Sequence, residues 1–166
     1  MIKNFIYVAL LFATLTSAAQ TSKILSSDEM QKNFPATVYF SGQAATAQLR
    51  NSAGIRSGEG KQTLFAMVDT GGYSSALRER YQFYILSDAA IEISGKRLAP
   101  GAYGAGFLEG TGMLVMDLGG NEIFHTKFSN DPGLKRPRPL LVVADEKTGE
   151  YRLYIGRNYI TFHQAK

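Results

Sequence analysis

The sequence predicts an all-β protein, an antiparallel sandwich or barrel of about ten strands with one short N-terminal helix. Three observations carry this prediction. Short apolar segments recur at intervals of roughly 8–12 residues, which is typical of sandwiches and barrels. Gly, Asn, Asp and Pro separate these segments, and such residues favour turns. The segments themselves are rich in Tyr, Phe, Val and Thr, the residues that strands prefer.

The N-terminal helix is expected to begin after Ser26. Ser26 and Glu29 have the spacing of a capping box, and the acidic pair Asp28–Glu29 suits the positive end of a helix. Pro35 should end the helix, because the residue before a proline avoids helical geometry. The segment "SALRERY" (75–81) is a candidate for a second short helix.

The other elements are expected to be strands. Their ranges are 37–40, 46–50, 63–69, 82–86, 90–93, 102–108, 112–118, 122–128, 139–144, 151–155 and 159–162. Glycine-containing turns separate many of them, as in "SGKR" (94–97), and suit tight hairpins. We therefore interpret 82–128 as a consecutive antiparallel meander and 139–162 as a second hairpin group. The proline-rich segment 132–139 is expected to be a surface crossover, because proline cannot donate to a strand ladder.

The first nineteen residues have the pattern of a signal peptide. Lys3 precedes the apolar run Phe5–Leu15, and the small residues at 17–19 predict cleavage between Ala19 and Gln20. The apolar run is too short to span a membrane. We expect an exported bacterial protein, periplasmic or extracellular, with one β-rich domain over 20–166 and no transmembrane segment.

Composition excludes several classes of chemistry. The chain has no Cys, which rules out thiol catalysis and thiolate metal sites. The formal net charge of +4 includes Lys3 and is spread along the chain, so no nucleic-acid partner is indicated. The two histidines are far apart: His125 is expected on a half-exposed strand and His163 in the C-terminal tail. Neither a metal nor another cofactor is expected.

One candidate binding surface is a pair of glycines. In "ISGKRLAPGAYGAGF" (93–107), strand alternation places Gly104 and Gly106 on the same face. The bare backbone there must be approached by an aromatic ring, another strand or a ligand.

The same hairpin is similar to the "GGKxLPAGxY" element of uncharacterised secreted bacterial β-domains. The matching residues are Gly95, Lys96, Leu98, Pro100, Gly101 and Tyr103. This resemblance implies a secreted β-fold and no particular activity.

A second resemblance concerns Asp69, Thr70 and Gly71. The apolar segment "LFAMV" followed by this triplet resembles the catalytic element of retropepsin-like aspartic proteases, and Tyr154–Ile155–Gly156 resembles their second element. The resemblance implies a homodimer in which two Asp69 side chains activate a water molecule. The competing interpretation is a strand that ends in an aspartate accepting backbone hydrogen bonds within a glycine turn. "IGRNYITF" also fits a strand, a turn and a strand.

A nearby segment is a loose version of another catalytic motif. Gly72 to Ala76 resembles a nucleophile elbow, but that chemistry needs a βα-alternating sheet, and this chain is predicted to be all-β.

The only basic cluster consists of Lys135, Arg136 and Arg138, in the predicted crossover. It is either a solvated loop or a site for an anionic component of the cell envelope. Taken together, the residues favour an exported, non-enzymatic binding or structural module of the envelope. Two alternatives remain: the homodimeric protease using Asp69, and a small-ligand-binding β-barrel whose cavity opens at Gly104 and Gly106.

Overall fold

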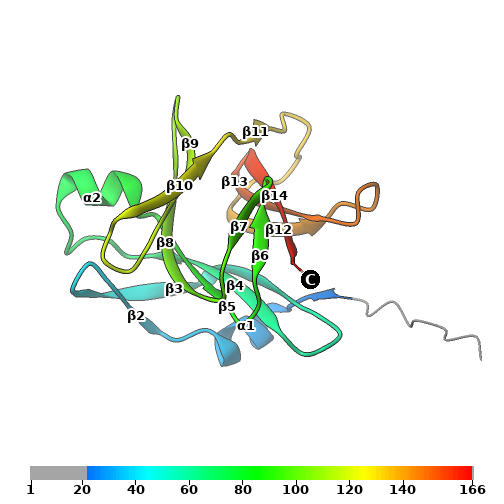
Figure 1. The fold of residues 1–166 in the computed structure, drawn as a ribbon, viewed down its shortest axis with the longest axis horizontal. Helices are drawn as coiled ribbons and strands as arrows, with labels where there is room; N and C mark the ends of the chain where they lie inside the picture. The colour runs from blue at the N-terminus through cyan, green and yellow to red at the C-terminus, as the bar shows by residue number, and fades with distance from the viewer. Residues whose placement is uncertain (1–21, 166) are drawn as a thin grey trace, which may run out of the picture.

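The computed structural model describes residues 22–165, which form two antiparallel β-sheets packed face to face (Figure 1). The predicted all-β class is confirmed, and within this range the strands form a sandwich of two separate sheets. The predicted signal peptide and its cleavage site lie outside the described residues.

The first sheet has eight strands in the order β1-β3-β4-β5-β8-β9-β10, with β2 also paired to β3. Their bounds are β1 Lys23–Ile24, β2 Thr37–Phe40, β3 Gln43–Arg56, β4 Gln62–Val68, β5 Phe83–Ser87, β8 Gly101–Leu108, β9 Gly112–Met116 and β10 Glu122–Thr126.

The second sheet has six strands in the order β12-β13-β14-β6-β7, with β11 also paired to β14. Their bounds are β6 Ile91–Ile93, β7 Lys96–Leu98, β11 Ser129–Asn130, β12 Arg138–Ala144, β13 Tyr151–Gly156 and β14 Asn158–Gln164.

The strand ranges agree with the prediction except in a few places. Three strands of two or three residues, β1, β7 and β11, have no counterpart among the predicted ranges. Strand β3 is 14 residues long, whereas the sequence predicted only 46–50. A register shift between Gln48 and Ser52 interrupts its pairing with β4, so its polar and apolar residues do not alternate regularly.

The predicted meander over 82–128 is wrong in its pairing. Strand β5 pairs directly with β8, while β6 and β7 leave the first sheet and join the second, where β6 pairs with β14. The physical reason is that Ile91, Ile93 and Leu98 pack in the core between the sheets from the side of the second sheet. Local turn chemistry predicts the hairpin but cannot say which sheet receives it.

The corner that returns the chain to the first sheet uses the residues of the "GKxLxPGxY" hairpin. Ser94 and Gly95 both have positive φ and form the tight turn between β6 and β7. The Tyr103 hydroxyl donates to the Ala99 carbonyl at 2.9 Å, which closes the corner around Pro100. A tyrosine bonded to the backbone a few residues upstream is a known way to fix a corner in β-sandwiches.

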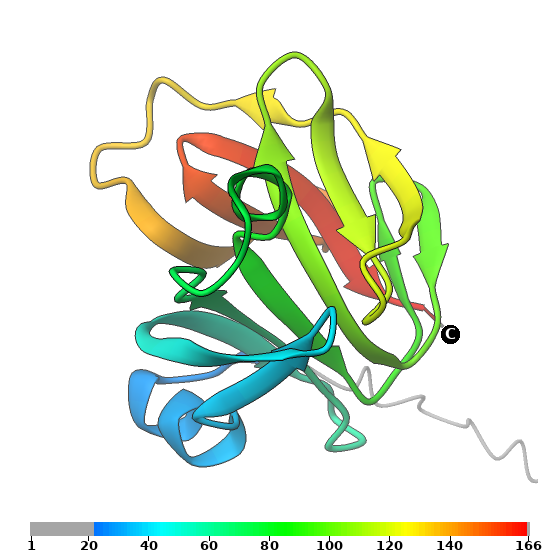
Figure 2. The same ribbon diagram turned by 90° about the vertical axis from the view of Figure 1, so that its left-hand side faces the viewer.

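The main core lies between the two sheets. Phe65, Phe83 and Ile85 of the first sheet face Leu153 and Phe162 of the second, and all five are fully buried. In Figure 2 the red strands β13 and β14 lie behind the green strands of the first sheet.

The opposite face of the first sheet is covered as well. The short helix α1 (Ser27–Asn33) and strand β2 contribute Met30, Phe34, Val38 and Phe40 to a second core. The first sheet is therefore an inner layer, with the second sheet on one side and α1 and β2 on the other. Because both faces are covered, strand β9 is buried at all five positions.

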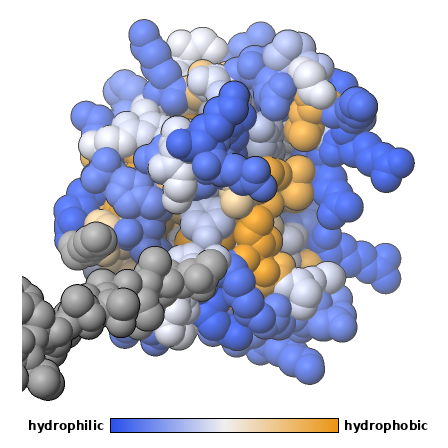
Figure 3. Space-filling model, turned by 90° about the vertical axis from the view of Figure 1, so that its right-hand side faces the viewer, coloured by the Kyte–Doolittle hydropathy of each residue, from blue (hydrophilic) through white to orange (hydrophobic). Residues whose placement is uncertain are grey.

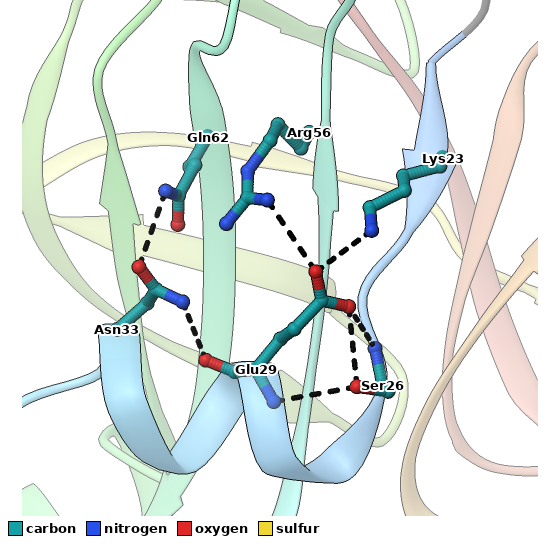
Figure 4. Close-up of polar contacts among 6 residues, drawn as sticks. All are labelled: Lys23, Ser26, Glu29, Asn33, Arg56 and Gln62. Carbon is teal, nitrogen blue, oxygen red and sulfur yellow. Dashed lines mark hydrogen bonds and ion pairs between the residues drawn. The ribbon is translucent and has the colours of Figure 1, made fainter.

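The predicted start of α1 is confirmed in detail. The Ser26 hydroxyl accepts from the Glu29 amide while the Glu29 carboxylate accepts from the Ser26 amide, a complete capping box. The same carboxylate pairs with Lys23 of β1 at 2.7 Å and with Arg56 of β3 at 3.4 Å (Figure 4). Glu29 thus ties the helix to two strands of the first sheet.

The second helix candidate is also confirmed, as α2 (Ser75–Arg80). Its N-cap is Ser74, whose hydroxyl accepts from the Leu77 amide at 3.4 Å.

Neither described helix, among residues 22–165, has the length and apolar character of a membrane-spanning helix.

Candidate functional site

The Asp69 side chain is exposed and follows the last residue of β4. Its Oδ1 atom accepts from the Gly71 amide at 3.0 Å, and its own amide donates to the Thr46 carbonyl at 2.9 Å. The Thr70 carbonyl accepts from the Tyr73 amide, which continues the turn. Asp69, Thr70 and Gly71 therefore form a surface turn in which the aspartate accepts a backbone hydrogen bond.

The second protease-like element is a β-hairpin. Ile155 pairs with Asn158, so Gly156 and Arg157 form a two-residue turn in which Gly156 has positive φ. Gly156 belongs to the second sheet, whereas Asp69 follows a strand of the first. Strand β14 begins two residues after Gly156, so this glycine is followed by a strand.

The strip at Gly104 and Gly106 is filled by the chain itself. A Cβ atom on Gly104 would lie 2.3 Å from the Phe40 ring, and one on Gly106 would lie 2.4 Å from the Arg80 carbonyl oxygen. The two glycines make room for internal packing, so this strip does not form the mouth of a ligand cavity.

The remaining catalytic candidates are also accounted for by local contacts. Ser74, in the elbow-like segment Gly72–Ala76, caps α2. His125 is exposed and lies 3.0 Å from Glu122, while His163 lies within β14, and not in a tail as predicted, at 3.3 Å from Glu150. In the part of the chain that the structure describes, no group of three or more His, Asp or Glu side chains could hold a metal ion.

The basic cluster lies at one end of the second sheet. Lys135, Arg136 and Arg138 are exposed, and Arg138 pairs with Gly156 across β12 and β13. This register brings the turn residue Arg157, also exposed, to the same end. We call these four cations the basic end. Among residues 22–165 none of them forms an ion pair.

Lys135 and Arg136 lie in the loop between β11 and β12, and Arg138 is the first residue of β12. This loop runs from β11, beside β14, to β12, beside β13. It therefore passes around the β13–β14 turn, as Figure 2 shows for the yellow-to-orange segment near the red hairpin. Asp131 anchors the start of the loop: its Oδ2 atom accepts from the Tyr154 hydroxyl at 3.0 Å, and its amide donates to the Arg157 carbonyl at 2.9 Å. The basic end is thus held in place by the sheet.

A cluster of polar and aromatic side chains continues from this anchor along the outer face of the second sheet. The Tyr154 and Tyr159 rings lie 5.1 Å apart, and the Arg152 guanidinium lies 4.8 Å from the centre of the Tyr159 ring. Arg152 also donates through Nε and Nη2 to one oxygen of Asp145, the Nε bond measuring 3.0 Å.

The electrostatics of this cluster favour the charged forms of Arg152 and Asp145. The Tyr154 hydroxyl and the Asp145 carboxylate raise the pKa of Arg152, and Arg152 in turn lowers the pKa of Asp145. Burial raises the pKa of Tyr154, so this residue stays a neutral hydrogen-bond donor. The cluster is therefore a fixed arrangement of one cation, one anion and two phenols.

Beside the cluster lies a hollow of about 380 Å³. Its lining residues are Val143, Ala144, Asp145, Glu146, Lys147, Arg152 and Tyr154. Figure 3 views this side of the molecule, opposite to Figure 2, and shows apolar surface between hydrophilic side chains. Two of the exposed large apolar residues, Ile24 and Val143, belong to the contacting strands β1 and β12.

The prediction from sequence included three of the four cations of the basic end but not Arg157, Arg152 or Tyr159, while Tyr154 was noted only as part of the protease-like element. A signal was present, because Arg152 and Tyr154 alternate with the core residue Leu153, as Tyr159 does with Ile160. What the sequence lacked was the register that places Arg157 beside Arg138.

No family model, curated protein or solved structure matches this chain.

Proposed function

We propose that this chain is an exported, non-enzymatic module of the bacterial cell envelope that binds an anionic component through its basic end. The observation that carries the proposal is the meeting of Lys135, Arg136, Arg138 and Arg157 at one end of the second sheet with no ion pair among the described residues. Exposed cations without ion pairs among the described residues attract anions. The hydrogen bonds of Asp131 hold the start of their loop against the second sheet, which lowers the cost of ordering on binding.

The proposal of a binding role, in place of an enzymatic one, rests on the candidate catalytic groups. Asp69 is exposed and bonded to a backbone amide, and each histidine contacts one glutamate. General acid–base catalysis needs groups that converge on one reacting atom. The proposed location in the periplasm or outside the cell rests on the N-terminal sequence pattern alone.

The test compares wild-type protein with a variant in which all four cations of the basic end are replaced by glutamine. Three anionic probes are titrated at low ionic strength: polygalacturonate, polyphosphate and vesicles containing phosphatidylglycerol. Wild type is expected to bind at least one probe, with affinity that falls as salt is added. The variant is expected to bind that probe at least about tenfold more weakly, since each exposed contact contributes up to about 1 kcal/mol.

A matched variant controls for net charge. It replaces Lys32, Arg50, Lys61 and Arg78, four other exposed cations without ion pairs among residues 22–165, by glutamine. These residues belong to α1, β3, the β3–β4 turn and α2, none of which carries a cation of the basic end. Equal loss of binding in both variants, or no binding of any probe by wild type, would contradict the proposed function.

A further inference from the structure

We infer that the anionic component is an acidic glycan that lies along the outer face of the second sheet, from the basic end to the hollow beside Arg152. This inference rests on the proposed function and names the class of ligand.

The first argument is that this face is open. Both faces of the first sheet are covered, one by the second sheet and the other by α1, β2 and the second core. On the second sheet, Leu153, Ile160 and Phe162 point inward to the core, so the alternate residues Arg152, Tyr159, Thr161 and His163 point outward. All four are half-buried and so keep part of their surface in solvent, whereas Tyr154 on the same face is buried and bonded to Asp131.

The second argument is length. Between Arg152 and Gly156 strand β13 advances about 13 Å, which exceeds the length of one sugar ring. The hollow of about 380 Å³ lies at one end of this path and the basic end at the other. The face therefore suits an extended chain better than a single small anion.

The third argument is chemical. The half-buried Tyr159 ring and the exposed side chain of Val143 offer apolar contact to the C–H faces of sugar rings. Carboxylates on the glycan would pair with the basic end. The hollow is lined by two cations and two carboxylates, so there Lys147 would pair with a single glycan carboxylate while Asp145 and Glu146 would accept from sugar hydroxyls. Arg152 is already held by Asp145 and by the Tyr159 ring, so its side chain loses little conformational entropy when a ligand binds.

The same observations favour a glycan over a membrane surface. Among residues 22–165, the exposed large apolar residues are Ile24, Tyr39, Leu118, Ile123 and Val143. None of them belongs to the segment 131–138, where Leu134 is half-buried, or to the Arg157 turn, so the basic end has no exposed large apolar side chain for insertion into lipid.

The test uses galacturonate oligomers of two to ten residues with the mature chain. Affinity is expected to rise with length until the face is covered. Lys147→Gln is expected to weaken the longest oligomer about two- to fivefold while leaving the dimer unchanged, since the dimer can occupy the basic end alone. Tyr159→Ala is expected to weaken long oligomers about fivefold and to leave polyphosphate binding unchanged, because polyphosphate has no sugar ring to stack.

Tyr39→Ala is the matched control, because Tyr39 is 67% exposed on β2 of the first sheet. Should Tyr159→Ala fail to fold, the exposed substitution Lys147→Gln still decides the outcome. If vesicles or polyphosphate bind through the basic end while oligomer length and both variants have no effect, the glycan inference is overturned and the proposed function stands. If no anionic probe binds, both fail.

Discussion

At the scale of single residues, two buried tyrosines of the second core differ in whether their hydroxyl groups are hydrogen-bonded. Tyr81 is fully buried and stacks on Phe40 at 4.0 Å, and its hydroxyl finds no hydrogen-bond partner within residues 22–165. Burial raises its pKa, with smaller contributions from Tyr73 and Tyr84. The neighbouring Tyr73 hydroxyl, by contrast, lies 2.9 Å from the Gln43 carbonyl oxygen and 3.1 Å from that of Phe40.

These two tyrosines should respond oppositely to loss of the hydroxyl. Tyr81→Phe is expected to leave the free energy of unfolding unchanged or to raise it by up to about 1 kcal/mol, because it removes an unsatisfied buried group. Tyr73→Phe is expected to lower it by about 1–2 kcal/mol, because the one hydroxyl proton that the Gln43 and Phe40 carbonyl oxygens share is lost. Urea denaturation of both variants measures the difference. A larger loss for Tyr81→Phe would mean that its hydroxyl has a partner such as a buried water.

Asp69 is the residue for which the two sequence interpretations differ most. As an acceptor for the Gly71 amide, it should tolerate Asp69→Asn with a change below about 0.5 kcal/mol, whereas Asp69→Ala should cost about 0.5–1.5 kcal/mol. Peptide hydrolysis at acidic pH is expected from neither the wild type nor the Asn variant. Wild-type hydrolysis that Asp69→Asn abolishes would establish the protease alternative.

At the scale of elements, α1 depends on one carboxylate. Lys23 and the Ser26 amide lower the pKa of Glu29 from 4.5 to about 2. A carboxylate with a lowered pKa in the folded state stabilises the fold above its unfolded pKa, and this contribution is lost as the pH falls toward the folded value. The contribution of Glu29 should therefore disappear between about pH 4.5 and pH 2.

Glu29→Gln tests this dependence. The variant is expected to be less stable than wild type at pH 7, and the gap should close as the pH falls from 4.5 to about 2. Lys23→Gln removes the largest cause of the lowered pKa of Glu29. It should therefore bring this pKa closer to 4.5 and shorten the pH range over which the stabilisation is lost. Thermal denaturation across the range measures both effects. A gap of equal size at pH 7 and pH 2 would show that the helix does not depend on the ionised side chain.

Strand β8 must have a glycine at position 104 because the Phe40 ring of β2 packs directly against its backbone. Gly104→Ala is expected to lower the free energy of unfolding by about 1–3 kcal/mol, because its Cβ would lie 2.3 Å from a ring that is itself fully buried. Gly72→Ala is the control, since its nearest neighbour would be 3.8 Å away. Combining Gly104→Ala with Phe40→Leu should cost less than the sum of the single changes. Additive costs would mean that the two residues do not compete for space.

Sequence patterns predicted elements better than their pairing. The capping box at Ser26 and the turn at Ser94–Gly95 are local signals, and both are present in the structure. The transfer of β6 and β7 to the second sheet, and the meeting of Arg157 with Arg138, depend on partners more than 15 residues away in the chain. No local propensity carries that information, so the meander and most of the candidate site could not be predicted.

At the scale of the whole molecule, the first sheet is shared by two cores, one on each of its faces. Strand β4 contributes Phe65 to the core between the sheets and Leu64 to the second core, through alternate faces. Neighbouring strands do the same, so loss of packing in either core should be transmitted through shared backbone hydrogen bonds. A domain of this size with one shared sheet is expected to unfold as a single cooperative unit.

Two leucine substitutions test this unity. Leu64→Ala opens space in the second core and Leu153→Ala in the core between the sheets, and each should cost about 2–5 kcal/mol. Both variants are expected to lower one common transition in scanning calorimetry, with equal calorimetric and van't Hoff enthalpies. Two separate transitions, with Leu64→Ala shifting only one, would show that α1, β2 and their core unfold independently. The second sheet, with its proposed binding face, would then keep its fold when that layer is lost.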